Sequence, residues 1–126
     1  MTDADFPEDL CLFISDAIPT IDAAQLLVLL AQDPIRHWKV EDILQELRPT
    51  VIAESEIRRC LSLFLARGLV VENQDGRFHY RPTSPDLDAT VGALAKAFNQ
   101  RPVTLIGIIY SRKIQSFADA FKIKKD

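Results

Sequence analysis

The sequence predicts a mainly α protein of the α+β class, in which several helices accompany one short β-hairpin. Apolar residues recur at three- and four-residue spacing along most of the chain, as they do on one face of a helix. One central segment instead alternates apolar and polar residues around a turn sequence, as a hairpin does. The 126 residues are 48% hydrophobic, which is enough for the core of one domain.

The most informative segment is residues 53–81, whose pattern predicts a helix, a glycine that ends it and a two-stranded β-hairpin. The apolar face of the predicted helix consists of Ile57, Cys60, Leu61, Phe64 and Leu65. At 100° per residue, the opposite arc consists of Ser55, Arg58, Arg59 and Ser62, with Glu54 and Glu56 at its edges. Gly68 follows Arg67, as a left-handed C-terminal cap would.

A hairpin is expected directly after this glycine. Leu69, Val70 and Val71 change the composition to aliphatic and β-branched residues. The turn chemistry is supplied by Asn73-Gln74-Asp75-Gly76. On the second strand, Phe78 and Tyr80 alternate with Arg77, His79 and Arg81.

Two helices are expected before residue 35. Pro7-Glu8-Asp9 begins the first, which Pro19 ends, and its apolar stripe consists of Leu10, Phe13, Ile14 and Ala17. Thr20 or Asp22 can cap the second, which Asp33-Pro34 ends. The second helix is apolar nearly all round, so it has to be covered on most sides.

A third helix follows Trp38, for which we expect a packing role, and carries Val40, Ile43, Leu44 and Leu47. The turn to the next helix is Arg48-Pro49-Thr50-Val51-Ile52, because Pro49 disfavours helical backbone at Arg48. The N-cap positions of these two helices, Lys39 and Ala53, hold no usual capping residue, although Thr50 or Ser55 is an alternative cap for the second.

More helix is expected after the hairpin. Ser84-Pro85-Asp86 is a helix start, and the buried stripe consists of Leu87, Val91, Leu94, Ala95 and Phe98. Residues 103–110 are ambiguous: their β-branched content suggests a strand, but their place after Pro102 favours a kinked, continuing helix. A last short helix would carry Ile114, Phe117, Ala118 and Phe121, before a basic tail.

This order of helix, turn, helix, glycine and hairpin resembles the winged helix-turn-helix domains of small bacterial MarR- and ArsR-like transcriptional regulators. The resemblance covers about the middle half of the chain. It implies a single domain over residues 1–126: a winged-helix core at 20–82, an acidic N-terminal helix at 1–19, and C-terminal helices at 83–126 as candidates for dimerisation.

The resemblance also implies binding to double-stranded DNA. Base and phosphate contacts in the major groove would come from Ser55, Arg58, Arg59 and Ser62. Contacts to the DNA backbone would come from Arg77, His79 and Arg81 of the wing. The alternatives are a solvated helix face with Glu54–Arg58 and Glu56–Arg59 pairs, and an exposed strand whose bases protect the sheet edge.

Charge is distributed unevenly along the chain. Residues 1–35 carry seven acids and no Lys or Arg, residues 36–82 carry eight bases and seven acids, and residues 83–126 carry seven bases and four acids. The net charge of −3 argues against indiscriminate nucleic-acid binding but leaves a local positive face open. Opposite charge at the two ends favours packing of the segment 87–121 on the helix at 7–17, within one subunit or between two.

Other site chemistries are not indicated. Cys11 and Cys60 fall on apolar helix faces without a preceding signal peptide, so buried thiols in a cytoplasmic protein are expected. His37 and His79 lack partners at metal-ligand spacing, and no Gly-rich phosphate loop, GxSxG or HExxH sequence occurs. We therefore expect no metal, no cofactor, no enzymatic activity and no membrane span.

The sequence predicts a DNA-binding transcriptional regulator of winged-helix type that acts as a homodimer through its C-terminal helices. The alternative is a winged-helix module that binds another protein and not DNA, since acids border the predicted recognition helix face and the wing turn lacks Lys and Arg.

Overall fold

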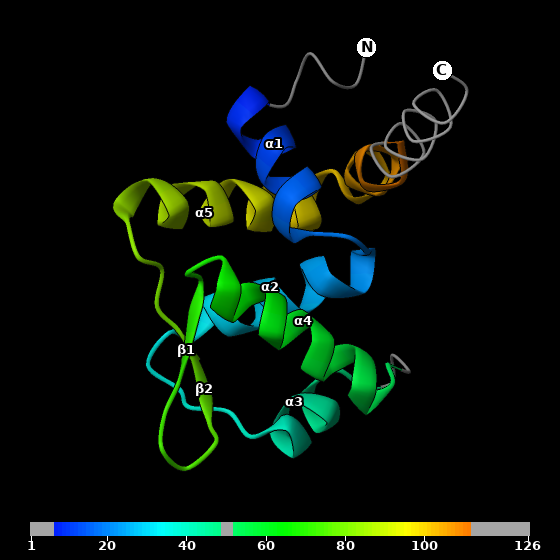
Figure 1. Cartoon of the computed structure of the whole chain (residues 1–126). Helices are drawn as coiled ribbons and strands as arrows, with labels where there is room; N and C mark the ends of the chain where they lie inside the picture. Colours follow the sequence, from blue (N-terminus) through cyan, green and yellow to red (C-terminus); the bar gives the residue numbers. More distant parts are fainter. Residues whose placement is uncertain (1–6, 49–51, 112–126) are drawn as a thin grey trace, which may run out of the picture.

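A computed structural model describes residues 7–48 and 52–111 (Figure 1). In order, the elements are α1 (Glu8–Ala17), α2 (Ile21–Gln32), α3 (Val40–Glu46), α4 (Glu54–Ala66), β1 (Val70–Glu72), β2 (Phe78–Tyr80) and α5 (Pro85–Gln100). A further helix covers Pro102–Ser111. The mainly α, α+β prediction is confirmed, and the order of elements gives a winged-helix-like topology.

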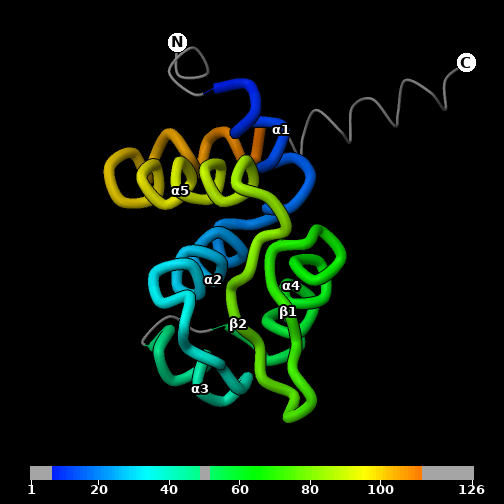
Figure 2. The backbone as a smooth tube through the Cα atoms, turned by 90° about the vertical axis from the view of Figure 1, so that its left-hand side faces the viewer, coloured from blue at the N-terminus to red at the C-terminus, as the bar shows by residue number. Residues whose placement is uncertain are grey.

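The elements form two layers that share α2 (Figures 1 and 2). On one side of α2 lie α1, α5 and the Pro102–Ser111 helix, and on the other lie α3, α4 and the hairpin. Because α2 contacts α5, α4 and β2, its apolar surface is covered on most sides, as predicted. Its buried residues are Ala23, Ala24, Leu26, Leu27, Val28 and Leu30.

Hydroxyl caps begin two of the helices as expected. Thr20 Oγ1 accepts a hydrogen bond from Ala23 N at 3.1 Å, and Ser84 Oγ accepts one from Leu87 N at 3.2 Å. The predicted N-caps Lys39 and Ala53 are confirmed, and neither side chain caps its helix. At α3, Asp42 Oδ2 instead accepts from Lys39 N at 3.1 Å, which satisfies the donor from inside the helix.

The hairpin forms at the predicted residues, with the predicted turn. Val70 lies opposite Tyr80 and Val71 opposite His79 in an antiparallel pair. Asn73 Oδ1 accepts from both Asp75 N and Arg77 N at 3.0 Å, so the turn is fixed by one amide side chain.

A bridge that was not predicted from the sequence joins the segment before α3 to the two-stranded sheet. Trp38 N donates to Phe78 O at 2.7 Å, and Phe78 N donates to Trp38 O at 2.8 Å. This antiparallel bridge places β2 between β1 and the segment before α3. Trp38, Phe78 and Tyr80 are buried on the core side, so the packing role expected for Trp38 is confirmed.

The C-terminal part is helical where it is described. Residues 103–110, for which a strand was the alternative, lie in the Pro102–Ser111 helix, whose buried residues are Leu105, Ile108 and Ile109. On α5, Val91 and Leu94 are buried as predicted, Leu87, Ala95 and Phe98 are half-buried, and Ala97 is an additional buried residue. α5 packs on α1 within the chain, so part of its apolar surface is used internally.

Several predicted features lie outside the described residues: Pro49, Thr50 and Val51 of the turn, the last short helix with Ile114, Phe117, Ala118 and Phe121, and the basic tail. Within the described ranges, no single helix is long and apolar enough to cross a membrane. α1 and α2 are long and apolar enough for this only when they are taken together, and a bend of 106° separates them.

Gly68 connects α4 to the hairpin in a conformation that other residues rarely adopt. Its φ is +73°, as the predicted left-handed cap requires. Gly68 O also accepts from Thr83 N at 2.9 Å, and a Cβ at position 68 would lie 2.9 Å from Thr83 Cγ2 and Oγ1. A glycine is therefore needed here for two reasons: the turn requires a positive φ, and Thr83, between β2 and α5, lies too close for a Cβ.

We predict that Gly68→Ala lowers the free energy of unfolding by roughly 2 kcal/mol, from left-handed strain and displacement of Thr83. Gly76→Ala is the matched control, because Gly76 has φ +77° but open space around its Cβ position; its cost should be roughly 1 kcal/mol. Urea unfolding measures both. Equal losses would show that the Thr83 contact adds nothing.

Candidate nucleic-acid interface

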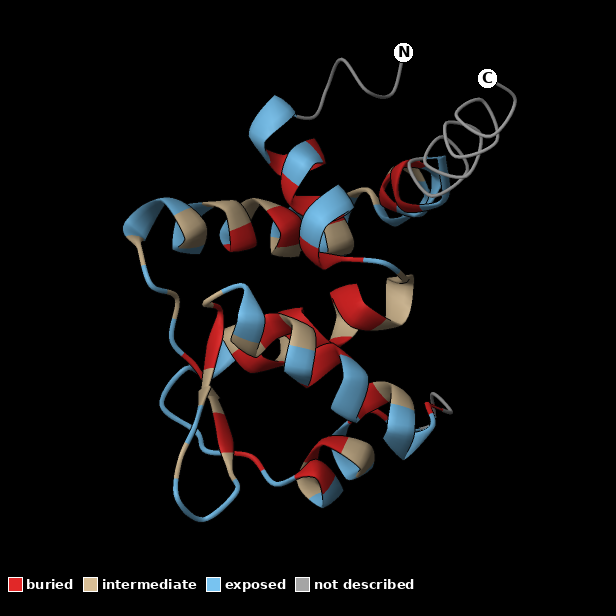
Figure 3. Ribbon diagram, viewed as in Figure 1, coloured by how far each residue is buried: buried red, intermediate tan, exposed pale blue. Residues whose placement is uncertain are grey.

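The outward arc of α4 is formed as the helical period predicts. Ser55, Arg58, Arg59 and Ser62 are all exposed. The opposite face anchors the helix in the core through Ile57, Cys60, Leu61 and Phe64, with Leu65 half-buried. Figure 3 shows this division along α4, where buried and exposed segments alternate. The arc is therefore free to meet a macromolecule while the helix stays fixed.

Both arginines of this arc are paired with acids of the same helix. Arg58 Nη2 lies 2.8 Å from Glu54 Oε2, and Arg59 Nη2 lies 2.6 Å from Glu56 Oε1. Exposed pairs of this kind contribute only about 0.5 kcal/mol each. A phosphate or a base could therefore replace the carboxylates at small cost, but the acids themselves would remain close by.

The wing presents its basic residues on the face away from the core. Phe78 and Tyr80 are buried, and because side chains alternate along a strand, Arg77, His79 and Arg81 share the other face. Arg77 and His79 are half-buried, whereas Arg81 is exposed. Arg77 Nε and His79 Nδ1 are buried without a hydrogen-bond partner.

His37 joins this face from a distant part of the sequence. Its ring stacks on His79 with a centroid distance of 4.3 Å and an interplanar angle of 6°. His37 Nδ1 lies 3.1 Å from Asn73 Nδ2 in the wing turn. His37 was not among the predicted contact residues. The alternation of exposed and buried residues in His37, Trp38, Lys39 and Val40 is a period-two signal that could have revealed this extended segment.

The environment of His79 disfavours its charged form. Burial is the main cause that lowers the pKa of His79, and the neighbouring His37 and Arg81 lower it further. His79 therefore favours its neutral form on a face whose formal charges come from arginine.

Two contacts hold the wing sheet on the helices. Tyr80 hydroxyl donates to Asp88 Oδ1 of α5 at 2.8 Å; burial and this carboxylate raise the pKa of Tyr80. In the segment that bridges to β2, the Arg36 guanidinium lies 3.7 Å from the centroid of the Trp38 ring, a cation–π contact, and 3.8 Å from Glu46 Oε1. The wing is thus tied to α5 and to α3.

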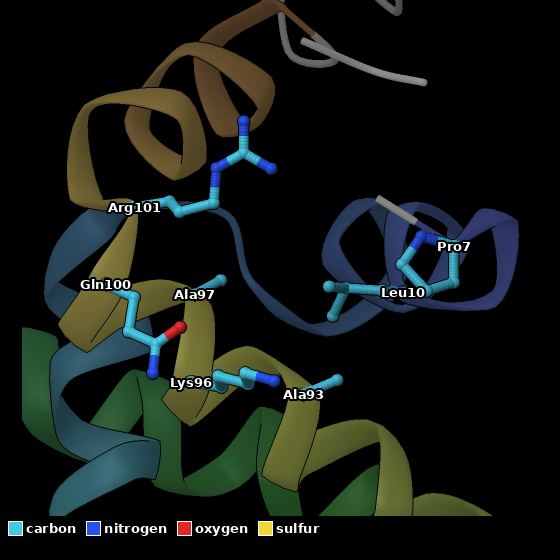
Figure 4. A pocket seen from close by; sticks show the side chains of 7 residues that line it. All are labelled: Pro7, Leu10, Ala93, Lys96, Ala97, Gln100 and Arg101. Carbon is cyan, nitrogen blue, oxygen red and sulfur yellow. The ribbon is translucent and has the colours of Figure 1, made fainter. Parts of the chain in front are cut away.

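A separate pocket of about 350 Å³ lies in the other layer, between α1 and α5 (Figure 4). Leu10, Ala93 and Ala97 give it an apolar wall, and Lys96 and Gln100 are polar lining residues. It lies away from α4 and the wing. Among residues 7–48 and 52–111, no group of three or more His, Cys, Asp or Glu side chains could hold a metal ion.

Comparison with protein-family models, with curated proteins and with solved structures found no match.

Cys60, on the buried face of α4, gives this helix a measurable pH dependence. Burial is the main cause that raises its pKa from 9.0 to about 12, and Glu56, whose Oε2 lies 3.8 Å from Cys60 Sγ, adds to it. Below pH 9 the thiol is protonated in both folded and unfolded chains. Above pH 9 the unfolded chain ionises first, so the stability that Cys60 contributes is lost as pH rises toward 12.

We predict that this effect lowers the free energy of unfolding by about 1.4 kcal/mol between pH 8 and pH 10. Urea unfolding under reducing conditions at pH 8, 9 and 10 measures it. Cys60→Ala should lose most of this decrease, whatever its stability at pH 8, and keep only the smaller part that Tyr80, whose pKa is also raised, contributes near pH 10. A similar slope in this variant would contradict the assignment.

Proposed function

We propose that the protein binds double-stranded DNA through α4 and the wing, and that it regulates transcription as a homodimer by occupying a promoter. The observation that carries this proposal is the outward arc of α4: its Ser and Arg side chains are exposed while the rest of the helix is fixed in the core of a winged-helix-like fold. It is also the kind of surface that small bacterial MarR- and ArsR-like regulators, which the sequence resembles, would use.

The arc has the chemistry for reading DNA. Arginine can donate two hydrogen bonds to the O6 and N7 atoms of guanine, and serine can bond to several base edges or to phosphate. In this assignment Ser55, Arg58, Arg59 and Ser62 contact the major groove, and Arg77, His79 and Arg81 contact the backbone.

Charge sets the strength of this binding. The winged-helix core over residues 20–82 carries eight bases and nine acids, so it has no strong overall attraction for DNA. Binding then depends on local contacts, for which Arg58 and Arg59 have to leave Glu54 and Glu56. Those two pairs favour a second candidate function, a module that binds a protein, because a mixed-charge face suits a protein surface better than a phosphate backbone.

Charge variants of α4 distinguish these functions. We predict that Arg58→Ala combined with Arg59→Ala lowers affinity for duplex DNA at least roughly tenfold, because a lost bidentate contact costs about 1–3 kcal/mol. Glu54→Gln combined with Glu56→Gln should raise affinity, because it frees both arginines and removes two repelling charges. Lys96→Ala, on the exposed side of α5, is the control and should have little effect.

Binding is measured by fluorescence anisotropy with fragmented genomic DNA over a salt series. If both double variants bind as the unchanged protein does, α4 is not the recognition helix. If the unchanged protein does not bind DNA even at low salt, DNA binding is rejected, and capture of a protein partner on the α4 face becomes the test of the second function.

For the homodimer, the described residues include an exposed apolar surface on the Pro102–Ser111 helix. Val103, Ile106 and Tyr110 are 82%, 38% and 41% exposed, and their spacing of three and four residues places them on one face with Gly107. This stripe contains no charge and is opposite the buried Leu105, Ile108 and Ile109. A second copy of the same stripe could pack against it around a two-fold axis, with Gly107 allowing close approach.

We predict that Ile106→Glu converts the dimer to a monomer, because it places two charges against each other in an apolar contact. Asn99→Glu is the control: it adds the same charge at an exposed position of α5 and should leave the mass unchanged. Light scattering after size exclusion measures both. A monomeric unchanged protein would reject the dimer, and a dimeric Ile106→Glu variant would reject this interface.

A further inference from the structure

The hydrogen bond between Asn73 and His37, in the stacked pair of His37 and His79, has a defined donor and acceptor. Asn73 Oδ1 accepts from Asp75 N and Arg77 N, so the other end of that amide, Nδ2, is the donor that faces His37 Nδ1 at 3.1 Å. His37 Nδ1 must then accept, which leaves the proton of a neutral His37 on Nε2. A second proton on His37 would set two donors against each other.

His79 is the member of the pair that can gain a proton. Its Nδ1 is buried and has no hydrogen-bond partner, so no protein group holds a proton there, and a bound anion would have to contact Nε2. In the free protein, burial, His37 and Arg81 lower its pKa. An imidazolium here would have a donor without an acceptor, close to other cations.

The charged groups around the pair are mostly cations. Arg77 and Arg81 share the wing face with His79, and Lys39 and Arg36 flank His37 in sequence. Arg36 is already stacked on Trp38 and near Glu46 of α3.

The nearest acids in sequence do not contact the pair. On β1, Glu72 lies opposite Phe78, and so it is not on the face of the sheet that carries His79. The residue opposite His79 is Val71. Asp75 lies at the tip of the turn. Within the described residues, the recorded partners of the two imidazoles are each other and Asn73, and none is a carboxylate. The pair therefore lacks the anion that a charged His79 needs.

We propose that His37 and His79 form a phosphate contact of the wing, in which His37 donates from Nε2 and His79 takes up one proton as a DNA phosphate binds. This inference rests on the proposed DNA binding and adds His37 to its contact residues. Phosphate supplies the missing negative charge, so the protonated form of His79 is favoured in the complex. Because binding takes up a proton, the affinity for DNA rises as pH falls.

The test is the affinity for a 30-base-pair random-sequence duplex at fixed salt between pH 5.5 and 8. We expect affinity to rise roughly tenfold toward pH 5.5, since uptake of one proton gives at most tenfold per pH unit. His37 and His79 are the two histidines of the chain, so few other groups titrate in this range. Calorimetry in two buffers of different ionisation enthalpy counts the protons taken up.

Two substitutions at one position make the test specific. His79→Gln keeps a polar side chain but should lose most of the pH dependence. His79→Lys carries a permanent charge and should bind at pH 8 about as tightly as the unchanged protein does at pH 5.5. An NMR titration of the two imidazoles in the unchanged protein does not depend on how these variants fold. On DNA binding, the titration of His79 should move to higher pH.

The outcomes separate this inference from the proposed function. DNA binding that is independent of pH, or equally pH-dependent in His79→Gln, overturns the proton-linked contact and leaves DNA binding in place. A titration that moves for His37 and not for His79 overturns the assignment of the two roles. Absence of DNA binding at every pH rejects the proposed function and this inference with it.

Discussion

The burial of α2 is the constraint on which the arrangement of this protein depends. A helix that is apolar nearly all round cannot remain at a surface, so it needs elements on both sides. α5, on which α1 packs, covers one side, and α4 and β2 cover the other. Ala23 and Ala24, both fully buried, allow close approach where a larger side chain would hold a neighbour away. The two layers, and hence the direction in which α4 faces solvent, follow from this burial.

The same packing that exposes the arginines of α4 also places acids beside them. Arg58 and Glu54 are four residues apart, and Arg59 and Glu56 are three apart, which are the separations at which side chains on a helix meet. The arc therefore has charged side chains without a large positive field. A surface of this kind favours specific contacts over tight, unselective attraction to a polyanion, and this is consistent with the acidic composition of the chain.

The wing depends on contacts between segments far apart in sequence. The Trp38–Phe78 bridge joins the segment before α3 to β2, and Asn73 holds the turn with one end of its amide while the other end faces His37. These contacts bring two histidines together that are separated by 41 intervening residues in the chain. Tyr80 and Asp88 then connect the wing to α5, so the sheet is braced on both sides.

The sequence by itself determined the helices, the hairpin and the exposed arc of α4, because helical period, caps such as Thr20 and Ser84, and the turn at Asn73 act over a few residues. It also determined that α2 is buried. Only the tertiary structure decided that Trp38 forms a bridge to β2, that α5 packs on α1 within one chain, and that His37 stacks on His79. Those contacts join residues that are far apart in the sequence, and they depend on which buried surfaces pack together in the folded chain. The spacing of residues within one segment does not determine this.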